Sequence, residues 1–179
     1  MPNAFATRLR RLPSDVRAAT AVEFALLVTP LVFLILASLQ LSIVFFADQC
    51  LQSAATSAGR ALMTGSAQGA NDTQSQFVNV VCANAPVLFN CSNIMVDVES
   101  GSTYSNISTA PLTPAYDGNG NVTNTWNYNP GGPGDIVIMR VMYNWPIVAG
   151  PLLPGLADQS NGDRLLVATS VFKNEPYGQ

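Results

Sequence analysis

The stretch FALLVTPLVFLILASLQLSIVFFA, which begins at Phe24 and ends at Ala47, decides how this chain is organised. It carries no charged side chain. As a helix it would extend about 36 Å, which exceeds the roughly 30 Å hydrocarbon core of a bilayer. A cleaved secretory signal has a shorter apolar core, and a buried helix normally has a polar face. The stretch Phe24 to Ala47 is therefore predicted to be a transmembrane helix.

The charges on either side of this stretch predict its orientation. Residues 1–18 form a basic leader with four of the eight basic residues of the chain, which are Arg8, Arg10, Arg11 and Arg17. The opposite flank begins with Asp48, and the next basic residue is Arg60. Basic residues are enriched on the cytoplasmic side of membrane helices. We therefore expect a single pass through a bacterial inner membrane, with a cytoplasmic N-terminus and a periplasmic C-terminal domain.

The helix is expected to continue outside the membrane to about residue 63, so that residues 19–65 form one segment. A stripe of mostly small residues recurs at helical spacing, namely Leu51, Ala54, Ala55, Ala58 and Leu62. Gly65 is a typical helix stop. Small residues allow a second helix or a sheet to approach closely. The stripe can therefore pack on the protein's own domain or on a partner.

Residues 66–179 are predicted to form one α+β domain. Thr73 and Gln76 have capping-box spacing, so a short helix is expected to begin there, with Phe77, Val80 and Val81 buried. Three strands are expected at residues 94–99, 135–145 and 165–172. The second would place Val137, Met139, Val141, Tyr143 and Trp145 on one face. We expect about three antiparallel strands packed on the outer half of the long helix, in an order that the pattern leaves open.

A loop of about 34 residues runs from Gly101 to Gly134 between the first two predicted strands. Loops of this length are usually functional or mobile. Its Asp117-Gly-Asn-Gly-Asn121 stretch is similar to the start of a calcium loop, but Val122 and Tyr128 stand where glycine and glutamate are needed. Tight turns are therefore favoured over calcium, and no metal site or cofactor is predicted.

The three cysteines are all expected outside the membrane. An oxidising periplasm favours a disulfide between Cys82 and Cys91, and the alternative is a pair of buried thiols. Cys50 would then be the odd cysteine, which can pair with another subunit or stay free.

The composition argues against several functional classes. The chain has no histidine, which removes the commonest general base and metal ligand, so no catalytic residue is assigned and no enzyme is predicted. From residue 19 onward, four basic residues face ten acidic ones, which argues against nucleic-acid binding. No small-molecule substrate is expected.

Residues 17–31, RAATAVEFALLVTPL, resemble the start of TadE/TadG-like proteins, which are pseudopilin-like components of the Tad (Flp-type) tight-adherence pilus machinery. Residues 168–177, ATSVFKNEPY, are similar to the C-terminus of many such proteins. The resemblance covers residues 17–62 and 164–177. It implies a pilin-like layout and a role in pilus biogenesis and surface adhesion. The implied partners are the lipid bilayer, other pilus or pseudopilin subunits, and a prepilin peptidase.

The resemblance also implies cleavage between Ala18 and Ala19, which would make Glu23 the fifth residue of the mature chain. The new ammonium on Ala19 and the Glu23 carboxylate, one helical turn apart, could neutralise each other or a neighbouring subunit's partner. Ala18 departs from the family pattern, which usually has glycine there. An uncut chain would be a simple single-pass anchor, in which Glu23 favours the helix dipole.

A second function stays open from the sequence. The protein could be a membrane-tethered extracytoplasmic binding or accessory protein whose loop from Gly101 to Gly134 recognises a ligand.

Overall fold

The computed structural model describes residues 16–85, 87–148 and 155–177. The Arg8, Arg10 and Arg11 side chains of the predicted leader lie outside the described residues. The chain divides into two compact units, Met1–Ser42 and Ile43–Gln179. The predicted division into residues 1–18, 19–65 and 66–179 stays a prediction.

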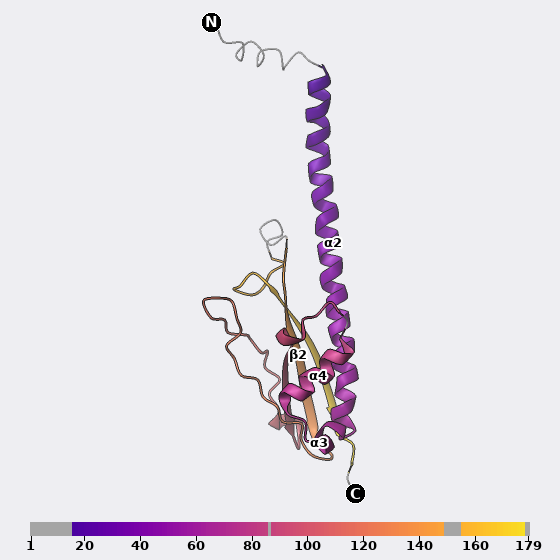
Figure 1. Cartoon of the computed structure of the whole chain (residues 1–179), viewed down its shortest axis with the longest axis vertical. Helices are drawn as coiled ribbons and strands as arrows, with labels where there is room; N and C mark the ends of the chain where they lie inside the picture. The colour runs from indigo at the N-terminus through magenta and orange to yellow at the C-terminus, as the bar shows by residue number, and fades with distance from the viewer. Residues whose placement is uncertain (1–15, 86, 149–154, 178–179) are drawn as a thin grey trace. The chain divides into compact units, whose positions relative to one another are not determined.

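Helix α2, Val16–Met63, is the long apolar helix that the sequence predicts (Figure 1). From Ala19 onward it is long and apolar enough to cross a membrane, and its most apolar window is not buried. Its hydroxyl groups donate to carbonyls of the same helix: Thr29 Oγ1 lies 2.7 Å from the Ala25 oxygen, and Ser42 Oγ lies 2.7 Å from the Ser38 oxygen. These bonds keep polar atoms satisfied within the helix, as lipid surroundings require. Pro30 stands beside Thr29 inside the helix.

Gly65 ends α2, as predicted, because it adopts a left-handed conformation with a φ of 76°. A side chain there would also collide with the ring of Tyr177. The C-terminal segment closes over this end of the helix, where the Glu175 N–H donates to the Met63 oxygen at 2.8 Å. Buried Asn174 donates from Nδ2 to the oxygens of Pro130 at 2.9 Å and Gly132 at 3.0 Å.

Two short helices follow, α3 at Ser66–Ala70 and α4 at Gln74–Asn84. The predicted capping box is present at the start of α4, where the Gln76 N–H donates to Thr73 Oγ1 and the Thr73 N–H donates to Gln76 Oε1. Phe77 and Val81 are buried, and Val80 is half-buried. The sequence reading missed α3, which lies between left-handed Gly65 and Asn71.

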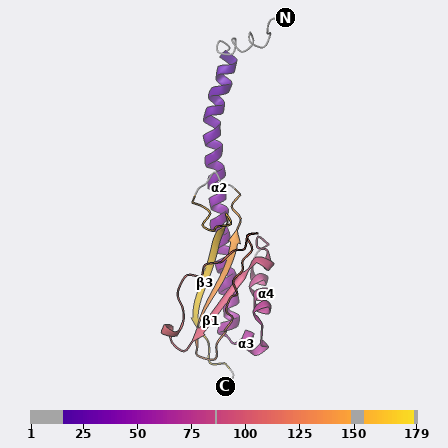
Figure 2. The same ribbon diagram turned by 90° about the vertical axis from the view of Figure 1, so that its left-hand side faces the viewer.

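The three strands are β1 at Met95–Gly101, β2 at Ile136–Trp145 and β3 at Arg164–Lys173. They form one antiparallel sheet in the order β1-β2-β3 (Figure 2). Residues 127–129 pair with the free edge of β1, since the Val98 N–H donates to the Asn127 oxygen at 2.9 Å and the Asn129 N–H donates to the Val98 oxygen at 2.8 Å. Short 3-10 turns lie at Cys91–Asn93 and Tyr104–Asn106. The α+β prediction is confirmed.

One face of the sheet packs on α2 within the unit Ile43–Gln179. The whole stripe of small residues is buried, namely Leu51, Ala54, Ala55, Ala58 and Leu62. A Cβ on Gly59 would lie 3.3 Å from Phe172 Cε1 and 3.4 Å from Met139 Cε, so the sheet approaches the helix closely there. The sequence leaves two uses open for the stripe, and in the structure the stripe packs on the protein's own domain.

On the opposite face of the sheet the long loop covers β1 and β2, whereas Val167 and Val171 of β3 stay exposed. Asp97 and Arg140 are buried there, with exposed fractions of 1% and 4%. Arg140 Nη1 lies 3.0 Å from Asp97 Oδ2, and Arg140 Nη2 donates to the Ser108 oxygen of the loop. The Asn127 N–H donates to Asp97 Oδ1 at 3.0 Å. The polar residues of β1 therefore bind the loop from Gly101 to Gly134, which forms a layer of the fold.

Candidate functional site

The residues that the resemblance singles out lie at the start of α2. Ala18 and Ala19 are helical in the uncut chain, and the side chains of Ala19 and Glu23 are exposed. The side chain of Ala18 lies outside the described part. Glu23 comes after the first turn of a helix that begins at Val16, and the helix dipole acts mainly on the first turn. A chain that began at Ala19 would bring Glu23 much closer to the positive end of the helix.

Exposed apolar side chains surround this part of α2. From residue 24 to residue 41 they are Phe24, Leu26, Leu27, Leu31, Val32, Phe33, Leu34, Ile35, Leu36, Leu39 and Leu41. Exposure of this kind is unfavourable in water and favourable in hydrocarbon. Glu23 thus lies at the edge of an exposed apolar surface on a helix that is long and apolar enough to cross a membrane.

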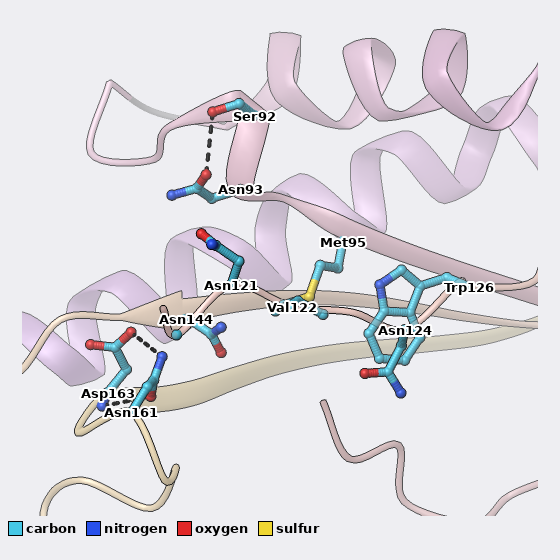
Figure 3. A pocket seen from close by; sticks show the side chains of 11 residues that line it. Ser92, Asn93, Met95, Asn121, Val122, Asn124, Trp126, Asn144, Asn161 and Asp163 are labelled. Atoms are coloured by element: carbon cyan, nitrogen blue, oxygen red, sulfur yellow. Dashed lines mark hydrogen bonds between the residues drawn. The ribbon is translucent and has the colours of Figure 1, made fainter. Parts of the chain in front are cut away.

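A second candidate site is a pocket of about 400 Å³ that the long loop forms with the sheet (Figure 3). Its lining consists of Ser92, Asn93, Met95, Gly120, Asn121, Val122, Asn124, Trp126, Asn144, Asn161 and Asp163. Asp163 and Asn161 stand at one end of it, and Trp126 and Asn124 stand at the other. Five of these side chains are amides, each of which can donate and accept hydrogen bonds.

Hydrogen bonds hold part of this lining in place. Asn144 Oδ1 accepts a hydrogen bond from the Tyr116 hydroxyl at 2.9 Å. Asn161 Nδ2 donates to Asp163 Oδ2 at 2.8 Å. Asn124 accepts from the Ala115 N–H. The sequence leaves ligand recognition by this loop open as an alternative, and it does not point to Asn144 and Asn161, because they come from β2 and from the turn before β3.

The calcium-like stretch forms a turn. Asp117 Oδ1 accepts the N–H groups of Asn119 and Asn121, both at 2.8 Å, and Gly120 has a φ of 82°. The hydrogen bond from the Asn121 backbone is the main reason why the pKa of Asp117 is lowered, because it stabilises the ionised carboxylate. This arrangement agrees with the preference for tight turns.

A disulfide joins Cys82, at the end of α4, to Cys91, as the sequence reading predicted. Their Cα atoms are 5.6 Å apart, a usual separation for a disulfide. The bridge links α4 to the start of the sheet. Cys50 is a free, half-buried thiol on α2.

Tyr128 of the long loop is partly buried against α4. Its ring lies 5.7 Å from that of Phe77, and its buried hydroxyl makes no hydrogen bond within the described residues. Burial is the main reason why the pKa of Tyr128 is raised to about 12, and the negative charge of Asp72 adds to the effect.

The raised pKa of Tyr128 predicts how stability changes at alkaline pH. Above pH about 10 the unfolded chain ionises Tyr128, whereas the folded chain keeps it neutral, so the contribution of Tyr128 to stability is lost as the pH rises from about 10 to about 12. We expect Tyr128→Phe to shift the alkaline unfolding midpoint upward. The control is Tyr104→Phe at an exposed tyrosine. Equal midpoints for the two variants would contradict the prediction.

One segment of the chain matches a known protein family. Residues 18–60 match the family model described as TadE-like protein. No curated protein and no solved structure matches the chain. The match covers the exposed apolar part of α2, Glu23 and most of the buried stripe, whereas the C-terminal resemblance at residues 164–177 stays a prediction. We therefore identify residues 18–60 as a TadE-like segment, which confirms over that range the resemblance read from the sequence.

Proposed function

We propose that this protein is a membrane-anchored, pseudopilin-like component of a Tad-type pilus assembly or secretion system, acting in pilus biogenesis and surface adhesion. The match of residues 18–60 to TadE-like proteins is the observation that carries the proposal. The exposed apolar surface of α2 supports it, because that surface suits lipid or the apolar helices of other subunits. The proposed partners are the bilayer, other pilus or pseudopilin subunits, and a prepilin peptidase.

The proposed orientation has the leader in the cytoplasm and the unit Ile43–Gln179 outside the inner membrane. The basic leader supports this direction, and so does the disulfide, which is favoured in an oxidising compartment. We further propose that the protein acts without catalysis, by binding other subunits.

Cleavage of the leader is tested by mass spectrometry of the protein extracted from membranes. We expect a mature chain that begins at Ala19. The variant Ala18→Gly, which restores the residue usual in the family, should be cleaved at least as completely as the natural chain. An intact leader, in a protein that never co-purifies with pilus components, would overturn the pilus proposal.

The role of Glu23 is tested by Glu23→Ala and by Glu23→Gln, which keeps the shape and removes the charge. We expect both variants to insert into membranes normally and to reduce piliation by about tenfold or more, because an ion pair in an apolar setting is lost. The matched control is Val22→Ala, which changes an exposed neighbour and keeps the carboxylate. Normal piliation in both Glu23 variants would remove the special role of this residue.

A second candidate function is ligand binding by the loop from Gly101 to Gly134. The amide-rich pocket favours it, because amide groups beside a half-buried Trp126 suit a neutral, hydroxyl-rich ligand such as a carbohydrate. A glycan array probed with the full chain and with Asn144→Ala tests this function. Binding that is lost in Asn144→Ala would support it, and no binding by the natural chain would argue against it.

A further inference from the structure

We propose that one end of the unit Ile43–Gln179 rests directly on the lipid surface. This end, here called the lipid-facing rim, consists of Phe45 and Phe46 of α2, Val87 and Leu88 after α4, and Val148 after β2. The inference rests on the proposed anchoring of α2 in a membrane. It adds that the outer domain itself touches the bilayer.

The domain packs on the last turn of the apolar stretch. Val44 is only 3% exposed, and Ala47 is buried as well. Both belong to one hydrophobic cluster with Phe89 and Trp145 of the domain. On the opposite side of the same turn, Phe45 and Phe46 are exposed. The last turn of the apolar stretch is therefore covered by protein on one side and open on the other.

The contacts between α2 and the sheet set how far the strand ends reach along the helix. Gly59 faces Met139 of β2. From Gly59 back to Val44 the helix rises about 22 Å, and from Met139 to Trp145 the strand extends about 20 Å. The opposite end of the unit is marked by the hydrogen bond from Glu175 to Met63, so β2 runs from there toward Val44. Trp145 thus comes level with Val44.

Apolar side chains of the domain are exposed at the level of Val44. Val148, three residues beyond Trp145, is 87% exposed, and Val87 is fully exposed. Phe89, two residues after Val87, is buried at this level, with its ring centroid 5.0 Å from that of Tyr143 and 6.0 Å from that of Trp145.

These side chains match the composition of a membrane interface. Interfacial segments bury phenylalanine and leucine at the boundary between headgroups and acyl chains, and exposed valines gain by leaving water. Phe45 and Phe46 of the rim also belong to the apolar stretch from Phe24 to Ala47, which makes a lipid surface the fitting occupant.

The test measures how deep individual positions lie in vesicles of phosphatidylethanolamine and phosphatidylglycerol. The full-length chain carries Cys50→Ser, so that a spin label reacts only with an introduced cysteine, while the disulfide from Cys82 to Cys91 stays closed. Labels are placed at the rim by Val148→Cys and Val87→Cys. Leu34→Cys marks the apolar part of α2, and Ser57→Cys marks an exposed position on its outer part.

Collisions with oxygen, which concentrates in lipid, are compared with collisions with a water-soluble nickel complex. We expect the rim labels to favour oxygen, as Leu34→Cys does, and Ser57→Cys to favour nickel. Rim labels as accessible to nickel as Ser57→Cys, with Leu34→Cys still in lipid, would overturn the rim and leave the anchor intact. A nickel-accessible Leu34→Cys would instead overturn the anchor itself. All four positions are exposed, so these changes should leave folding unaffected.

Discussion

Replacing Asp97 with Ala is expected to lower the free energy of unfolding by about 3–5 kcal/mol, since it leaves a buried charge without its partner. Asp97 lies 3.0 Å from the Arg140 guanidinium, and both side chains are nearly inaccessible to water. The second carboxylate near Arg140, that of Glu99, is 3.7 Å away and partly exposed, so it cannot fully replace Asp97. Asp97 also accepts the Asn127 N–H, so the variant should loosen the long loop as well.

The measurement is denaturant unfolding of the full chain in detergent micelles, followed by fluorescence of Trp126 and Trp145. Glu99→Ala serves as the matched control and should cost less than about 1 kcal/mol, as is usual for a partly exposed pair. The double variant Asp97→Leu with Arg140→Met removes both charges and should recover most of the loss. A loss below about 1 kcal/mol in Asp97→Ala would contradict the buried pair as a main support of the loop.

Replacing Ala58 with Leu is the second large change, with an expected loss of about 1–3 kcal/mol or more from overpacking. Ala58 is fully buried, and at the next residue the sheet leaves almost no room for a Cβ. The larger side chain must therefore displace the core side chains that pack around this part of α2. The loss should appear as a lower thermal unfolding midpoint of the full chain, measured by near-ultraviolet circular dichroism.

The matched control for Ala58→Leu is Ser57→Leu, which adds an apolar side chain at the adjacent, exposed position of the same helix. It should change stability by less than about 0.5 kcal/mol. The comparison also separates the two uses of the stripe. If Ala58 served mainly to bind a partner, Ala58→Leu would keep normal stability and lose assembly, and that result would contradict the packing described above.

Local chemistry explains the elements that the sequence predicts well. Gly65 can take the positive φ that ends α2, and the reciprocal hydrogen bonds of Thr73 and Gln76 begin α4. The alternation from Val137 to Trp145 places those side chains in the core. Each of these signals acts through neighbours within a few residues, so each can be read without knowing the rest of the fold.

Other features depend on residues far apart in the chain. The alternating pattern of the first strand suggests a polar face, yet Asp97 on that face is buried, because Arg140 and the loop meet it from 30 or more residues away. The length of the loop predicts a functional or mobile segment, and its composition does not reveal that it covers β1 and β2 of the sheet. The pocket likewise combines side chains of the loop, of β2 and of the turn before β3.

The sequence by itself determined the apolar helix, the caps, the three strands and the resemblance of the first segment to TadE-like proteins, because these follow from local composition and periodicity. Only the tertiary structure decided the strand order, the burial of the small-residue stripe and the pairing of Asp97 with Arg140. Each of these depends on which surfaces meet when water is excluded, and that is a property of the whole fold. The stretch from Phe24 to Ala47 shows both levels, since its apolar character is local, whereas the burial of Val44 and Ala47 at its end depends on the domain that packs there.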